Sequence, residues 1–171
     1  VLTAGSRAAT VAGWLIDAWD RAGIDGPARQ GNLGLDPIGV LARTGSLPKG
    51  LDAALDEVAA LANRSRDWAH VRTVEVDTGA YVDAGASEGQ EIAAALATGV
   101  AYLRALVDAG HTVDDAAGQI GFTLAADADV FATIATLRAM RRCWAHVVVE
   151  AGGSPAAAAP PISVRTARRM M

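Results

Sequence analysis

The pattern of apolar and polar positions is clearest over residues 71–110, where it predicts a strand, a turn and a long helix. Val71, Val74 and Val76 lie in a short apolar run, which is typical of a buried strand. The tripeptide Asp-Thr-Gly that follows consists of residues that favour turns. The middle of the chain is therefore predicted to be one βα unit.

The helix of this unit carries signals at both ends. Ser87, with Gln90 three residues later, fits the capping box, in which each side chain satisfies a free backbone N–H. Gly110 stands where a left-handed residue would end the helix. Between these ends apolar residues recur at helical spacing: Ile92, Leu96, Gly99, Val100, Leu103 and Val107.

The rest of the chain repeats this alternation of strand and helix. Helices are predicted from Val11 to about Gly23, over residues 51–66, and from a cap at Asp127 or Asp129 to Gly152. The other strands are predicted over residues 28–35, 119–124 and 162–164. The last helix is predicted to pack through one apolar side, formed by Phe131, Ile134, Leu137, Met140, Trp144 and Val148. A basic stripe is predicted on its opposite side: Arg138, Arg141 and Arg142.

Four strands that alternate with helices predict an α/β fold with parallel strands joined by right-handed crossovers. The strands are continuous apolar runs, as expected when both faces of a sheet are covered. A doubly wound sheet and a segment of a (β/α)₈ TIM barrel both fit this pattern. We favour the barrel, of which four units would be about half, because no glycine-rich phosphate turn follows any strand.

Size and composition narrow the possible partners and location. The chain has 171 residues, enough for one domain, and neither end carries a closing element, so we expect a segment of a longer protein. Its 15 basic and 19 acidic side chains leave a net charge of −4, too mild to predict nucleic acid or an anionic membrane as a partner. We expect a cytoplasmic protein, because the sequence shows neither a signal peptide nor a run of apolar residues long enough to span a bilayer.

Few residues have the spacing that a metal site or a catalytic cluster needs. Cys143 is the only cysteine, which predicts neither a disulfide framework nor a thiolate metal cluster. His70, His111 and His146 lie far apart without other ligands at helical spacing, so we expect surface or helix-end positions for them. The aspartates at 114–115, 127 and 129 are explained more simply as helix caps than as paired carboxylates. We therefore expect no metal site in this chain.

Asp77 and Asp83 are the most interesting carboxylates, because they follow the carboxyl end of a predicted strand. That end carries the active site in a barrel, yet aspartate before glycine or ahead of a helix is also ordinary turn chemistry. Both interpretations stay open. Arg165, Arg168 and Arg169 are predicted at the same edge, where they would hold an anionic group such as a carboxylate or contact another chain.

Three segments carry a resemblance to the methylmalonyl-CoA mutases. Residues 83–104 begin Asp-Ala-Gly-Ala-Ser and resemble the family's EAGA segment with its helix, and residues 131–144 resemble the helix after the next strand. Residues 164–166, Val-Arg-Thr, resemble the family's arginine-threonine-histidine strand. The three matches keep their order and spacing. The resemblance implies that residues 1–171 hold roughly the fourth to seventh strands of a barrel through which a coenzyme A chain threads.

The departures from the family pattern concern its catalytic side chains. Catalytic members carry a histidine three residues before the EAGA glutamate, where it hydrogen-bonds the substrate thioester, and that position is Ala80 here. A second histidine and a glutamine follow their arginine-threonine pair, where this chain has Ala167 and Arg169. Arg165 keeps the position of an arginine that engages the substrate carboxylate, and we interpret it as a relic. Losing one positioned donor typically costs about 10²–10³ in rate, so we expect no catalysis by this chain.

The resemblance also implies a place for the cofactor and the partner. The family's cobalamin-binding domain contains Asp-x-His-x-x-Gly, and no histidine here has an aspartate two residues before it. We therefore expect this segment to lack that domain and to bind no cofactor, with adenosylcobalamin held by a large catalytic subunit in a heterodimer. The chain is most similar to the family's non-catalytic small subunit. The alternatives are an active acyl-CoA mutase with altered specificity and, more remotely, an unrelated barrel enzyme that uses Asp77 and Asp83.

Overall fold

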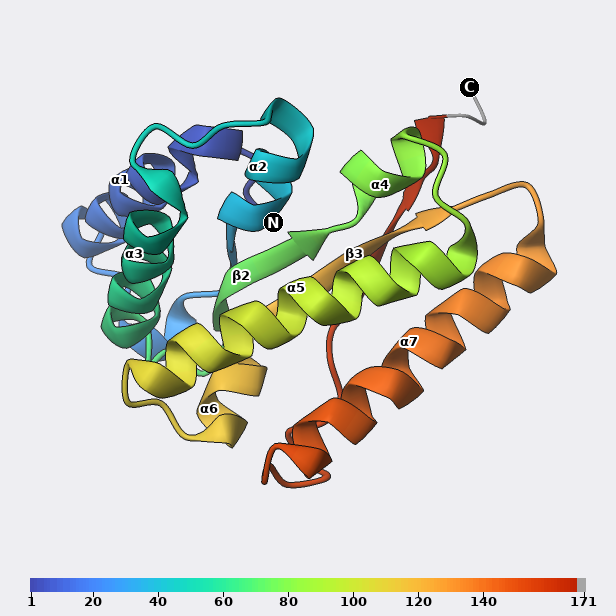
Figure 1. The fold of residues 1–171 in the computed structure, drawn as a ribbon. Coiled ribbons are helices and arrows are strands. Elements are labelled where there is room, and N and C mark those ends of the chain that lie inside the picture. Colours follow the sequence, from blue (N-terminus) through green and yellow to red (C-terminus); the bar gives the residue numbers. More distant parts are fainter. Residues whose placement is uncertain (169–171) are drawn as a thin grey trace.

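A sheet of four parallel strands forms the centre of the computed structural model, which describes residues 1–168 (Figure 1). The strands lie side by side in the order of the sequence, and each pairs in parallel with the next. They are β1 (Gly31–Leu35), β2 (Val71–Asp77), β3 (Ile120–Ala126) and β4 (Ile162–Thr166). The prediction of an α/β fold with parallel strands is confirmed.

Helices precede β1 and fill the connections between the strands. Four long ones are α1 (Ala8–Arg21), α3 (Gly50–Arg64), α5 (Glu88–Asp108) and α7 (Val130–Glu150). The short elements are α2 (Pro37–Thr44), α4 (Gly79–Asp83), α6 (Val113–Gly118) and the 3₁₀ turns η1 (Gly5–Arg7) and η2 (Gly26–Ala28). Figure 1 shows α5 and α7 running side by side across β2 and β3.

The predicted end signals of α5 and α7 are confirmed, whereas the cap of α6 is Thr112 rather than Asp114 or Asp115, which lie in its first turn. The Ser87 N–H donates to Gln90 Oε1 (2.9 Å) and the Gln90 N–H donates to Ser87 Oγ (3.4 Å), which completes the capping box of α5. Gly110 has a φ of +92°, in the left-handed region that favours glycine. Asp129, rather than Asp127, is the cap of α7, because its Oδ1 accepts the Ala132 N–H at 2.9 Å.

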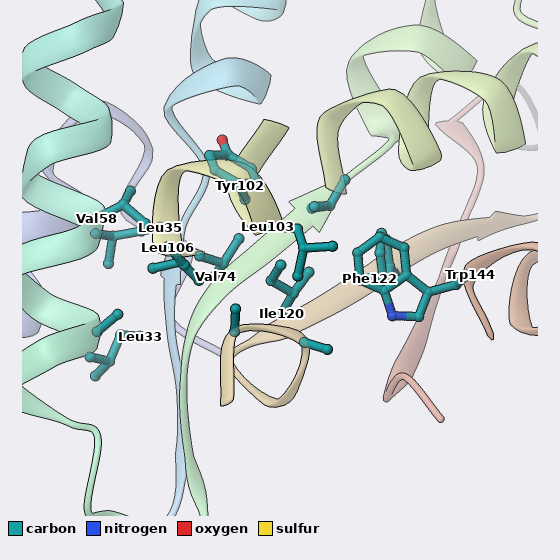
Figure 2. Packing of buried hydrophobic residues seen from close by; sticks show 14 of the residues in the cluster. Leu33, Leu35, Val58, Val74, Tyr102, Leu103, Leu106, Ile120, Phe122 and Trp144 are labelled. Carbon is teal, nitrogen blue, oxygen red and sulfur yellow. The ribbon is translucent and has the colours of Figure 1, made fainter. Parts of the chain in front are cut away.

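The main hydrophobic core lies between the sheet and the long helices (Figure 2). Its largest fully buried side chain is Trp144 of α7, whose ring meets Phe122 of β3 edge to face, with 4.9 Å between centroids and 68° between planes. A Cβ on Gly99 of α5 would lie 2.7 Å from the Trp144 ring, so this position requires glycine for α5 and α7 to approach so closely. The core thus fixes α5 and α7 against the middle of the sheet.

The sequence did not predict two of the short helices. Helix α2 begins directly after β1, where the Asp36 side chain accepts the Gly39 N–H (2.9 Å) and Pro37 takes the first helical position. Helix α4 has only five residues, too few to show a helical period. Two strands also differ from the prediction at one end. Strand β1 begins only at Gly31, and β4 continues to Thr166.

The apolar side predicted for α7 was partly wrong. Its buried positions are Thr136, Met140, Trp144 and Val148, four residues apart. At about 100° per residue, Phe131 and Ile134 point away from this side, and Phe131 is 85% exposed. Arg138, Arg141 and Arg142 are exposed too, so the basic stripe lies on the same outer side as Phe131 rather than across the helix from it.

Over residues 1–168, no helix combines the length and the apolar character that crossing a bilayer requires.

Candidate functional site

The carboxyl ends of the four strands meet at one edge of the sheet, which we call the carboxyl rim. The register pairs Leu35 with Val74, Asp77 with Thr123, and Ala126 with Thr166. Strand β1 therefore ends three residues short of β2, β2 ends three residues short of β3, and β3 and β4 end level. The charged side chains gathered at this edge are Asp36, Arg43, Asp77, Asp83, Arg165 and Arg168. The predicted meeting of Asp77, Asp83 and the terminal arginines is therefore confirmed for Arg165 and Arg168, while Arg169 lies outside the described residues.

These charges form a chain of ion pairs across the rim. Asp77 lies between two arginines, with 3.1 Å from its Oδ2 to Arg43 Nη2 and 3.4 Å from its Oδ1 to Arg165 Nε. Asp83 lies between Arg165 Nη2 (3.6 Å) and Arg168 Nε (3.7 Å). Arg165 belongs to β4 itself rather than to the segment after it, so its backbone is fixed by the sheet.

Asp77 also has the turn role that the sequence left open. Its Oδ1 accepts the Gly79 N–H at 2.8 Å, which fixes the turn between β2 and α4. Among the described residues, Asp83 has only its two ion pairs, whereas both oxygens of Asp77 accept a hydrogen bond, from the Gly79 N–H and from Arg43. This arrangement suits a structural site, because a general base needs a carboxylate oxygen that is free to take a proton.

Asp36 is a rim carboxylate that the sequence analysis missed. It accepts three hydrogen bonds, from the Tyr102 hydroxyl (2.7 Å), the Gly39 N–H (2.9 Å) and the Asp77 N–H (3.0 Å). Burial raises the pKa of Asp36, and burial together with Asp36 raises the pKa of Tyr102. Asp36 therefore connects β1, α2, α5 and β2. The Asp-Pro dipeptide at the start of α2 was the local signal that could have identified it as a cap.

Glu91 is a second buried carboxylate next to the rim. Its Oε1 accepts the Thr78 hydroxyl at 2.6 Å and the Ala125 N–H at 2.8 Å. These bonds join the first turn of α5 to the carboxyl ends of β2 and β3. Glu91 thus holds in place the segment that resembles the family's EAGA motif. Its two hydrogen bonds explain why a glutamate is useful at position 91.

Glu75 lies on the face of the sheet that points away from the main core, because its neighbours Val74 and Val76 point into that core. Asn32 Nδ2 donates to Glu75 Oε2 and the Thr123 hydroxyl donates to Oε1, both at 2.5 Å. Only 6% of Glu75 is exposed, and this burial raises the pKa of its carboxyl group. Both of its contacts can also be made by a protonated carboxyl, since Thr123 can accept as well as donate.

Replacing Glu75 by Gln is expected to make the full-length protein more stable at pH 7. A raised folded-state pKa means that wild-type stability falls as pH rises through that pKa, and is regained as pH falls towards the unfolded value of about 4.5. The glutamine side chain is not ionisable and can keep both contacts, so the variant should not show this loss. Each unit by which folding raises the Glu75 pKa corresponds to about 1.4 kcal/mol of lost wild-type stability at a pH above that pKa.

Urea denaturation of both proteins between pH 4.5 and pH 8 measures this effect, with the lower limit set by the ordinary pKa of glutamate. The matched control is Glu88→Gln, an exposed glutamate in the first turn of α5. Glu88→Gln should follow the wild-type pH curve. Identical pH curves for Glu75→Gln and the wild type would show that Glu75 has an ordinary pKa.

Ala80 and Ala167 both lie at the carboxyl rim. Ala80 is half-buried in the first turn of α4, and Ala167 follows β4, with its N–H donating to the Ala126 carbonyl at 2.9 Å. Ala167 is fully buried and packs with Val82 and Ala125 in a small apolar cluster. Each side chain is a methyl group, which neither donates nor accepts a hydrogen bond.

The three histidines lie away from this rim. His70 precedes β2, while His111 follows α5 and His146 lies in the last third of α7, where the helices have returned to the amino ends of the strands. His111 is only 4% exposed rather than on the surface, and burial lowers its pKa. Over residues 1–168, no three His, Cys, Asp or Glu side chains are grouped as a metal site requires.

Comparisons with known proteins agree on one family. The sequence model of the family described as "Methylmalonyl-CoA mutase" matches residues 1–168. The chain is 48% identical over 158 residues to the methylmalonyl-CoA mutase small subunit of Streptomyces virginiae, covering 92% of this chain and 25% of that protein. It is 43% identical over 135 residues to the small subunit of Propionibacterium freudenreichii subsp. shermanii, covering 78% and 20%.

A shorter match joins the chain to a relative whose name mentions no subunit. The methylmalonyl-CoA mutase of Escherichia coli (strain K12) is 38% identical over 66 residues, which is 39% of this chain and 9% of that protein. The chain spans about a quarter or less of the length of the curated relatives it matches. The match to small subunits thus extends over much more of the chain than the match to this relative.

Proposed function

The chain belongs to the methylmalonyl-CoA mutase family, and from that membership we propose that it is part of the non-catalytic small subunit of an adenosylcobalamin-dependent mutase. The assembled enzyme would interconvert (R)-methylmalonyl-CoA and succinyl-CoA by a radical rearrangement of the carbon skeleton. The large subunit would hold the cofactor and the substrate. The subunit that contains this chain would stabilise its large partner in a heterodimer in the cytoplasm.

The order of the strands supports the proposed barrel. A doubly wound sheet reverses its strand order at a switch point, whereas a barrel adds each new strand on the same side. Here β1 to β4 follow one another without reversal, and the long helices α3, α5 and α7 connect successive strands. We therefore propose that residues 1–171 form part of a (β/α)₈ barrel, corresponding to roughly its fourth to seventh strands.

The observation that carries the proposal of a non-catalytic chain is the pair of methyl groups at the rim. Ala80 and Ala167 occupy the positions where the resemblance to the catalytic members implies imidazoles. The packing of Ala167 against Val82 and Ala125 makes that part of the rim apolar and closed. An active mutase with a widened pocket, the alternative, would need this position to open towards the substrate, so the packing favours the non-catalytic interpretation.

The described residues do not fit a cobalamin site of their own. A lower axial ligand requires an accessible imidazole, and none of the three histidines lies at the carboxyl rim. His111 is the one that is buried, and neither of its ring nitrogens has a hydrogen-bond partner within residues 1–168. This supports a cofactor held elsewhere in the assembly.

Co-expression tests the proposed assembly. The full-length small subunit with an affinity tag is expected to retain an untagged large subunit through affinity and size-exclusion chromatography. The large subunit should also unfold at a higher temperature in the complex, since a partner present at about 100 times its Kd contributes about 2.7 kcal/mol to stability. A large subunit that is equally stable alone, and that never co-purifies, would rule the assembly out.

A further inference from the structure

The connection between α5 and α6 places an ionisable side chain in the interior of the protein. His111 follows the left-handed Gly110, and its N–H donates to the Leu106 carbonyl at 3.1 Å, which turns the chain back against α5. His111 is 4% exposed, and within residues 1–168 neither of its ring nitrogens has a hydrogen-bond partner. An imidazole in such a place is expected to be neutral, because a buried cation without a partner is costly.

The charged groups that act on His111 come from two other elements. Burial is the largest cause that lowers the pKa of His111 from 6.5, Arg66 just after α3 lowers it further, and Asp115 of α6 raises it. Arg66 and Asp115 are themselves paired, with 3.1 Å from Arg66 Nη2 to Asp115 Oδ2, and Arg66 also donates to the Gly110 carbonyl at 3.3 Å. A proton on His111 would therefore add a second cation to a pair that is already neutral.

The segment next to His111 is suited to local opening. Helix α6 has only six residues, and its first turn is fixed by Thr112, whose Oγ1 accepts the Asp115 N–H at 3.1 Å. Its buried residues are Ala116 and Ala117, whose side chains are single methyl groups. A short helix with so little buried apolar surface opens at a lower cost in free energy than the long helices of the main core.

We propose that His111 is an acid-sensitive latch for residues 109–118. While the imidazole is neutral, it stays buried and keeps the connection and α6 against α5 and the end of α3. Protonation favours an open state, in which the imidazole lies in water and the contacts of Arg66 with Gly110 and Asp115 are broken. This regulatory device does not rest on the proposed function, because it depends only on the groups around His111.

The direction of the pH dependence follows from the two states of the latch. In the open state the imidazole titrates near its ordinary value of 6.5, and in the closed state it titrates lower. The stability of the closed state is therefore complete above pH 6.5, and it is lost as the pH falls through 6.5 towards the lowered pKa. The opening equilibrium changes by up to about tenfold for each unit by which the closed state lowers the pKa.

Hydrogen exchange followed by mass spectrometry tests the latch in the full-length protein between about pH 7.5 and pH 5, with rates corrected for the intrinsic effect of pH. In the wild type, peptides covering residues 109–118 are expected to lose at least about threefold in protection over this range. His111→Leu fills the buried position without an ionisable group, so it should remove this pH dependence. If His111→Leu does not fold, His111→Gln is used, which should exchange faster but equally without pH dependence.

His70→Gln is the matched control, because His70 is exposed just before β2, and it should keep the wild-type pH dependence. Peptides from the middle of α7, residues 136–148, report global unfolding and should show no comparable change. Three results would overturn the inference. They are a wild type whose residues 109–118 show no pH dependence, an equal pH dependence in the folded His111 variant, and an equal loss of protection in the α7 peptides.

Discussion

Replacing Trp144 by alanine is expected to lower the free energy of unfolding of the full-length chain by about 3–5 kcal/mol. Trp144 is fully buried, and its ring packs edge to face on Phe122 (Figure 2). The ring also lies closely over Gly99. Truncation would leave a cavity between α5, α7 and β3 that the rigid sheet cannot fill. Urea denaturation followed by circular dichroism measures the loss as a lower midpoint.

Trp14→Ala is the matched control, because Trp14 is 63% exposed on α1. It removes the same side chain from the surface and should change stability by no more than about 0.5 kcal/mol. Trp144 Nε1 has no hydrogen-bond partner within the described residues, so the difference between the two variants reports packing. Equal losses for both tryptophans would show that Trp144 does not belong to the main core.

The parts of the fold that the sequence predicted well are those with strong local signals. Ser87, Gln90 and Gly110 define both ends of α5 within one stretch of chain, and the structure confirms each of them. The parallel order of the strands followed from their alternation with helices. Such predictions depend on residues a few positions apart, for which the sequence is sufficient.

The elements that were missed or misplaced depend on tertiary packing. Helix α4 is too short for a period, and the buried side of α7 is chosen by its contact with β3 and α5 rather than by apolar residues alone. Thr136 is buried while Phe131 is exposed, which reverses the order expected from their hydrophobicity. Nothing local to α7 specifies this choice.

The candidate site shows the same division between features that the sequence predicts and features that depend on tertiary contacts. The topology placed Asp77, Asp83 and Arg165 at one edge, because parallel strands all have their carboxyl ends at the same edge of the sheet. The partners of the buried carboxylates were not predictable, since Tyr102 is 66 residues from Asp36 and Thr123 is 48 residues from Glu75. Those hydrogen bonds depend on strand register and helix orientation, which only the folded structure provides.

A second large effect is expected in the rate of the mutase reaction. Ala80 and Ala167 each place a methyl group where the resemblance implies a hydrogen-bonding imidazole. One such donor typically contributes about 10²–10³ in rate, so the loss of two independent donors would lower the rate by about 10⁴–10⁶. The full-length small subunit is therefore expected to fall at least about 10⁴-fold below the complex with the large subunit.

The conversion of methylmalonyl-CoA to succinyl-CoA by the purified full-length small subunit, with adenosylcobalamin added, shows directly whether a subunit with Ala80 and Ala167 at the rim is catalytic. The same preparation is assayed again after the large subunit is added. We expect no detectable turnover before the addition and full activity after it. Turnover by the small subunit alone, within about 10² of the rate of the complex, would mean that Ala80 and Ala167 do not remove catalysis.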